Sequence, residues 1–123
     1  MANPNITAVT SILGITSFLI PTTTTATTWT VLTPASGTVH KINSIVAANV
    51  TTTAATITVS VNSAISGGGT AYRLAWQITI PANASLIITD KTTAFYVGET
   101  QSVVVTSSTT NAIEMVASYE AIS

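Results

Sequence analysis

Few residues in this sequence have side chains suited to acid–base chemistry. His40 is the one histidine, and the carboxylates are Asp90, Glu99, Glu114 and Glu120. A nucleophilic triad needs a histidine oriented by a carboxylate, with a serine in hydrogen-bond reach, and no nucleophile-elbow pattern marks such a serine. We interpret His40 as an exposed histidine at the start of a strand. The sequence therefore predicts no catalytic residue and no enzyme.

The carboxylates are not spaced for glycoside hydrolysis or for metal binding. Glu114 and Glu120 share one predicted strand, where six residues correspond to about 20 Å, too far apart for a catalytic pair. Asp90 and Glu99 lie in predicted turns, where solvated side chains are expected. The chain has no cysteine, which excludes disulfides and cysteine-based zinc sites. We expect no cofactor and no metal.

The charge content also limits the partners. Lys and Arg number 3, and charged residues make up 6% of the 123 residues, against about 25% in an average protein. Phosphate neutralisation needs more cations, so nucleic-acid binding is not expected. Gly67-Gly68-Gly69 lacks the Lys-Ser/Thr of a phosphate-binding loop and is interpreted as a flexible hairpin connection. No apolar run is long enough for a spanning helix, so no membrane partner is expected.

The elements that must position any site are strands. Threonine occupies 26 positions, and β-branched residues favour strands. Alternating segments are separated by turn residues at the spacing typical of a sandwich or barrel. We expect an all-β fold, an antiparallel β-sandwich of the jelly-roll or Ig-like type with about eight strands. The expected strands are 27–33, 38–49, 55–61, 71–80, 86–89, 94–97, 101–106 and 112–121.

Alternation also predicts which side chains face the core. The clearest row lies on the strand at 71–80, where we expect one face to be buried: Tyr72, Leu74, Trp76, Ile78 and Ile80. On the last strand, Ile113, Met115, Ala117 and Tyr119 are expected inward. Trp29 is less constrained, and it is the aromatic that leaves open a sugar-stacking surface as an alternative function.

The first 26 residues differ from the remainder, so we divide the chain into an extended N-terminal arm (1–26) and a β-sandwich domain (27–123). The arm has no charge, and its apolar cluster lacks a clean period of 2 or 3.6. A first strand of the core is an equal alternative. An exposed apolar arm requires a covering partner, so the expected interface residues are Ile12, Leu13, Ile15, Phe18, Leu19 and Ile20, with Trp29.

Four stretches carry a family resemblance. They are 2–6 (ANPNI), 41–49 (KINSIVAAN), 78–86 (ITIPANASL) and 117–123 (ASYEAIS). Together they resemble small virion structural proteins of tailed phages, especially phages of aquatic bacteria. The resemblance implies one β-sandwich domain with an Ile-Pro-Ala corner between strands, at 80–82 here, and a structural role without catalytic residues. Where the family has a Gly-rich or acidic turn after this corner, the sequence has Asn83-Ala84-Ser85.

These observations lead to one expected function and two alternatives. The expected function is a capsid decoration or cement protein, located in the virion and bound over junctions of the major capsid protein. The partners would be that protein or other virion proteins, together with further copies of the chain. A trimer is expected from lattice symmetry. The alternatives are a neck, tail or fibre component, and a carbohydrate-binding module or adhesin.

Overall fold

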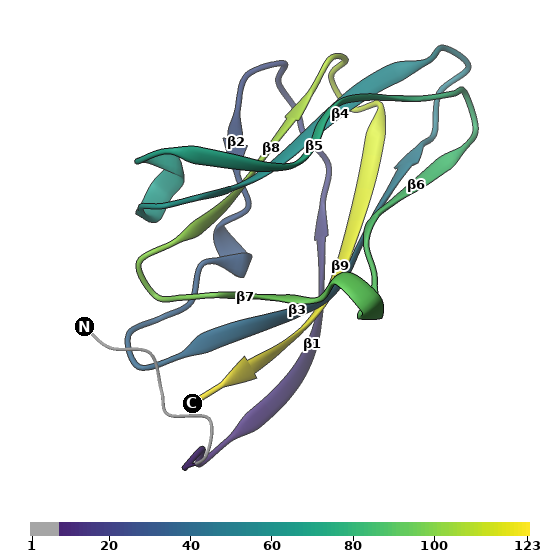
Figure 1. The fold of residues 1–123 in the computed structure, drawn as a ribbon. Helices are drawn as coiled ribbons and strands as arrows, with labels where there is room; N and C mark the ends of the chain where they lie inside the picture. The colour runs from purple at the N-terminus through teal and green to yellow at the C-terminus, as the bar shows by residue number, and fades with distance from the viewer. Residues whose placement is uncertain (1–7) are drawn as a thin grey trace.

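The computed structural model describes residues 8–123, which form nine strands and three short 3-10 turns (Figure 1). The strands are β1 (Ile12–Leu19), β2 (Thr27–Thr28), β3 (Val39–Asn49), β4 (Ala55–Asn62), β5 (Ala71–Ile80), β6 (Ser85–Thr89), β7 (Phe95–Val97), β8 (Ser102–Ser107) and β9 (Ile113–Ile122). The turns are η1 (Thr30–Leu32), η2 (Ile65–Gly67) and η3 (Lys91–Thr93). Every strand pair is antiparallel. The predicted antiparallel all-β class is therefore confirmed.

The strands form two sheets that share one core. One sheet has the order β1-β9-β3-β6, with β7 also paired to β3, and the other has the order β2-β8-β4-β5. Both sheets contribute to a single hydrophobic cluster, which includes Ile42 and Ile45 from β3 and Ile57 and Val59 from β4. Burial of this cluster supplies the main driving force for folding.

Strand β9 behaves as alternation predicts. The inward residues Ile113, Met115, Ala117 and Tyr119 of β9 are all buried. Between them Glu114 is exposed, and Glu120 is half-buried. The period of two places every second side chain on the core face, and no bulge interrupts β9.

Strand β5 does not follow its alternation, and the expected buried row is wrong except at its end. Ile80 is buried, whereas Tyr72, Leu74, Trp76 and Ile78 are exposed. The register with β4 shifts twice, once on each side of the pair formed by Val59 and Ala75, and each shift adds one residue to β5. The first extra residue places Ala75 instead of Trp76 on the core face, and the second reverses the faces again, so Tyr72 returns to the face of Ile78 and Ile80. As an edge strand, β5 also has a neighbour on one side only.

The predicted arm is corrected for residues 12–19, which form an edge strand of the first sheet (Figure 1). β1 pairs with β9 without a break, from Ile12 opposite Ile122 to Leu19 opposite Met115. The alternative of a first core strand describes this segment. Its irregular apolar pattern arises because Ile15 and Leu19 pack toward the core while Ile12 and Phe18 lie exposed on the other face. Residues 1–7 lie outside the described residues.

Trp29 is also placed differently from the expectation. Its side chain is 1% exposed, and its indole Nε1 donates a hydrogen bond to Ser17 Oγ of β1 at 3.1 Å. The expected strand at 27–33 is interrupted here, because η1 follows immediately after Trp29. Trp29 therefore joins β1 to the core instead of forming an exposed surface.

Candidate functional site

The one histidine is a structural residue rather than an exposed one. His40 is buried on β3, its Nδ1 lies 3.1 Å from the Leu32 carbonyl oxygen, and its ring centroid lies 4.7 Å from that of Tyr119. Burial lowers the pKa of His40 below its ordinary value of 6.5, and the hydrogen bond to the Leu32 carbonyl partly opposes this shift. A neutral imidazole is therefore favoured in the folded chain. With the Leu32 carbonyl as its partner, Nδ1 carries the proton and donates it.

The carboxylates are dispersed over the described chain. Asp90 caps η3, where its Oδ1 accepts hydrogen bonds from the backbone N–H and the hydroxyl of Thr92. Glu99 was expected to be solvated but is buried, and its Oε2 accepts a hydrogen bond from the Gly37 N–H at 2.7 Å. Within residues 8–123, no group of three or more His, Cys, Asp or Glu side chains is placed to hold a metal ion.

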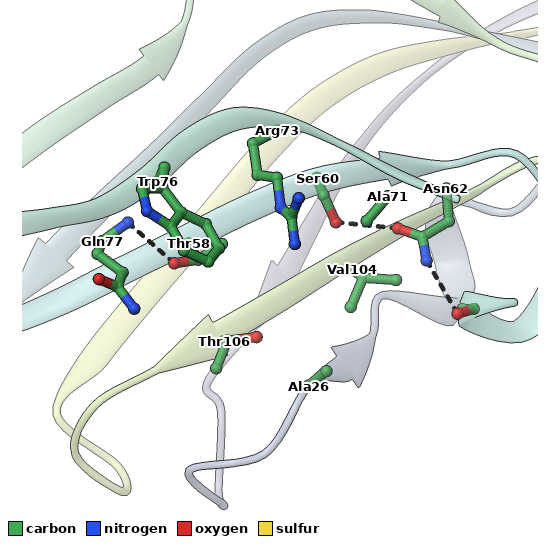
Figure 2. Close-up of a pocket in the computed structure, with 11 residues that line it drawn as sticks. Ala26, Thr58, Ser60, Asn62, Ala71, Arg73, Trp76, Gln77, Val104 and Thr106 are labelled. Carbon is green, nitrogen blue, oxygen red and sulfur yellow. Dashed lines mark hydrogen bonds between the residues drawn. The ribbon is translucent and has the colours of Figure 1, made fainter. Parts of the chain in front are cut away.

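A shallow groove of about 340 Å³ lies on the outer face of the β2-β8-β4-β5 sheet (Figure 2). Its lining includes Ser60 and Asn62 from β4 and Arg73, Trp76 and Gln77 from β5. The β5 bulge between Ala75 and Ile78 places Trp76 here, on the face opposite to the one expected. Trp76 is 55% exposed, and the Arg73 guanidinium lies 4.6 Å from its ring centroid, a cation–π contact.

Hydrogen bonds fix the polar side of this groove. Ser60 Oγ donates to Asn62 Oδ1 at 2.9 Å, and Asn62 Nδ2 donates to the Gly67 carbonyl at 2.9 Å. At the other end, the Gln77 N–H donates to Thr58 Oγ1 at 3.0 Å, which stabilises a backbone with a φ of 48° at Gln77. The groove thus combines one aromatic surface with amide, hydroxyl and guanidinium groups, a set suited to a polar ligand such as a sugar.

A second surface lies on the outer face of the other sheet. Phe18 of β1 stands opposite Val116 of β9, Val116 opposite Val46 of β3, and Val46 opposite Ile87 of β6. We call these four residues the apolar row. Phe18 is 73% exposed, Ile87 62% and Val116 40%, while Val46 is half-buried. The row therefore crosses four neighbouring strands, a continuous exposed apolar surface of the kind that marks interaction sites.

A bulge in β3 is needed to complete the apolar row. Ile42 pairs with Tyr119 and Ser44 with Ser118, so Asn43 is an extra residue in β3. Beyond it, Ile45 and Ala47 face the core, where both are fully buried. Val46, which lies between them in the strand, consequently faces outward beside Val116.

The predicted interface residues fall into three groups. Ile12, Leu13, Phe18 and Ile20 are exposed. Ile15 and Leu19 pack against the core, and Trp29 is buried. Only Phe18 belongs to the apolar row. Sequence reasoning missed Val46, Ile87 and Val116, although Val116 left a signal, because it is an apolar residue on the face of β9 that Glu114 and Glu120 make polar.

Comparison of the chain with protein-family models, with curated proteins and with solved structures finds no match in any of the three. Among residues 8–123, no helix has the length and apolar character needed to cross a membrane.

Proposed function

We propose that this chain is a non-enzymatic structural protein of a phage virion, a decoration or cement protein that binds over major-capsid-protein junctions and stabilises the shell. We further propose that its two sheets form a β-sandwich of the jelly-roll or Ig-like type. The observation that carries the proposal is the apolar row, an exposed surface across four strands in a chain with 3 cations. The resemblance to small virion proteins supports the same role.

The chemistry of the row suits permanent burial against a neighbour. Burying an exposed Ile or Phe side chain contributes about 1.5–3 kcal/mol, and a row with no charged member loses no ionic hydration on docking. A shell repeats one contact at every lattice position, and copies joined to one another would bind it with a higher overall affinity than a single copy. The major capsid protein is the partner that offers such repeated positions.

The copy number in purified particles tests the location. Quantitative mass spectrometry scaled to the major capsid protein is expected to give a ratio near one, or a simple lattice fraction of it. A trace ratio would assign the chain to the neck, tail or fibres, which is the alternative within the virion. Absence from particles would refute both placements.

A matched pair of isoleucines tests the docking surface. Ile87 on the apolar row is 62% exposed, and Ile65 on η2, away from the row, is 57% exposed. Each variant is added to shells that do not carry the protein, and binding is measured by co-sedimentation. Ile87→Thr is expected to bind fewer sites, because it removes apolar contact area while keeping a β-branched residue. Ile65→Thr should bind like the unaltered chain. Equal binding by both variants would exclude the row as the docking surface.

The groove around Trp76 favours a second candidate function, carbohydrate binding by an adhesin-like module. The supporting observation is the exposed indole beside Arg73, together with the hydrogen-bonded Asn62 amide and the Gln77 side chain that also lines the groove. Binding on a glycan array that disappears in Trp76→Ala would support this function. An array without signal for the unaltered chain would dismiss it. Trp29, the aromatic first considered for this role, is buried and unsuited to it.

A further inference from the structure

We propose that β1 is a self-pairing edge, and that two copies of this chain join through an antiparallel β1–β1 contact. An outer strand with free backbone groups is a template for pairing, and proteins usually protect it by shortness, bulges or charge. Among the described strands, the other outer strands are protected. β2 has two residues, β7 three and β6 five, and β5 carries two bulges and Arg73. β1 has eight residues, no bulge and no charge.

The register with β9 identifies which backbone groups of β1 are free. The Ser11 N–H donates to the Ser123 carbonyl, and the Ser123 N–H donates to the Ser11 carbonyl. These two residues therefore form a hydrogen-bonded pair of the antiparallel ladder, and such pairs recur at every second residue. The uninterrupted register continues this pattern along β1. The N–H and C=O groups of Ile12, Gly14, Thr16 and Phe18 consequently point away from β9, to the side where no described strand lies.

One register lets a second copy satisfy all of these groups. With Ile15 of one copy opposite Ile15 of the other, Ile12 lies opposite Phe18 and Gly14 opposite Thr16. These are the hydrogen-bonding positions on both strands, so the outward groups of all four residues are paired in each copy. Moving the register by one hydrogen-bonding step in either direction leaves Ile12 or Phe18 opposite a residue beyond the strand. In this arrangement the β1-containing sheets of the two copies join into one sheet, and the outer face of one copy continues into the outer face of the other.

The side chains favour a second copy as the occupant. Ile12 and Phe18 lie on the outer face and are 60% and 73% exposed, and the register places them against each other twice, once on each side of the two-fold axis. β1 has no charge, so identical strands meet without like-charge repulsion. Because Phe18 also ends the apolar row, the exposed apolar surface continues from one copy to the other. The contact is two-fold, in contrast to the trimer expected from lattice symmetry.

Single cysteines test the register, since the chain has no cysteine of its own. Ile15→Cys places two thiols at a non-hydrogen-bonded pair with Cα atoms about 4.5 Å apart, within the range of a disulfide. Under mild oxidant it is expected to form a covalent dimer. Gly14→Cys and Thr16→Cys are the controls, because each would self-pair only in a shifted register. Cross-linking at either control in preference to Ile15→Cys would overturn the proposed contact.

A proline on the free edge tests the hydrogen bonds. The Thr16 side chain is exposed and its N–H faces away from β9, so Thr16→Pro removes an intermolecular donor and leaves the β1–β9 ladder intact. Sedimentation equilibrium is expected to give twice the chain mass for the unaltered protein and for Thr16→Val, and the monomer mass for Thr16→Pro. Far-UV circular dichroism and urea titration establish that the variants are folded.

The proposal is overturned if the unaltered chain stays monomeric up to about 0.5 mM, a concentration at which mass action favours even weak dimers. It is also overturned if a folded Thr16→Pro variant retains the dimer mass. The contact does not depend on the virion role. Ile87→Thr is expected to weaken shell binding with the dimer mass unchanged, so failure of shell binding and failure of self-pairing are distinguishable.

Discussion

The two tryptophans of the chain provide the sharpest test of the fold. Trp29 is 1% exposed and joins the core cluster, whereas Trp76 lies on the outer face of β5. Trp29→Ala removes a buried indole, and Trp76→Ala removes one that is already largely in water. The structure therefore predicts very different losses of unfolding free energy for the same chemical change.

The magnitude follows from burial. A Trp-to-Ala change in a core costs about 3–5 kcal/mol, including the cavity that remains. A 123-residue chain has a total stability of about 6–18 kcal/mol at the usual value per residue, so Trp29→Ala removes a large part of it. Trp76→Ala loses limited contact area and an exposed cation–π contact worth about 0.5–1 kcal/mol. Its expected cost is therefore about 1 kcal/mol or less.

The hydrogen bond from Trp29 Nε1 to Ser17 Oγ, 3.1 Å long and buried, adds a measurable component. Trp29→Phe keeps an aromatic ring in the cavity but leaves the Ser17 hydroxyl without this donor, at a cost of about 1–3 kcal/mol. A double-mutant cycle with Ser17→Ala isolates the interaction, and we expect a coupling of about 0.5–1.5 kcal/mol.

Urea titrations followed by circular dichroism give all of these free energies, because the backbone signal is independent of the tryptophan being removed. Fluorescence adds a direct readout of position. The emission of Trp76→Phe, which reports Trp29 alone, is expected at shorter wavelength than that of Trp29→Phe, which reports Trp76. Equal destabilisation by the two alanine variants, or a reversed order of emission, would refute the placement of Trp29 in the core.

Two further predictions concern titrating groups. Because burial holds the folded-state pKa of His40 below 6.5, the unfolded chain binds more protons just below that pH, and stability should fall as the pH drops from 6.5 toward the lower folded value. His40→Gln, whose amide N–H retains a donor for the Leu32 carbonyl, should remove this part of a urea-midpoint profile. The hydrogen bonds from Thr92 lower the pKa of Asp90 below 3.8, so Asp90→Ala should destabilise the chain at neutral pH. This difference should vanish at a pH below the folded-state pKa of Asp90, which thermal unfolding at several pH values would show.

The sequence was sufficient to predict the fold class and most strand positions. β9 alternates without interruption on the core face, so the period of two identifies both the strand and its buried side. Antiparallel pairing follows from the same alternation, which is typical of antiparallel sheets rather than of parallel sheets buried on both faces. Tertiary packing is not needed to see these features.

The sequence was not sufficient where the backbone departs from regular pairing. The bulges of β5 and the one at Asn43 of β3 are properties of two strands paired together, and neither strand alone contains the register that defines them. Trp76 therefore lies on the face opposite to the one predicted, and Val46 faces outward, without a local signal for either. Gln77 has a positive φ, but a glutamine in a sequence does not predict that conformation as a glycine or an asparagine does.

The positions of the few charged residues indicate that the absence of charge from the β1 edge is a specific feature. With 6% charged residues in the chain, scarcity alone would account for an edge without charge. Yet one of the 3 cations, Arg73, lies on the edge strand β5, and Asp90 and Lys91 directly follow β6. Charge is thus present at edges on both sheets and absent from the longest regular one. Protection by charge, bulges and shortness at the other edges makes the exposed, uninterrupted β1 a specific feature, which supports its assignment as a pairing surface.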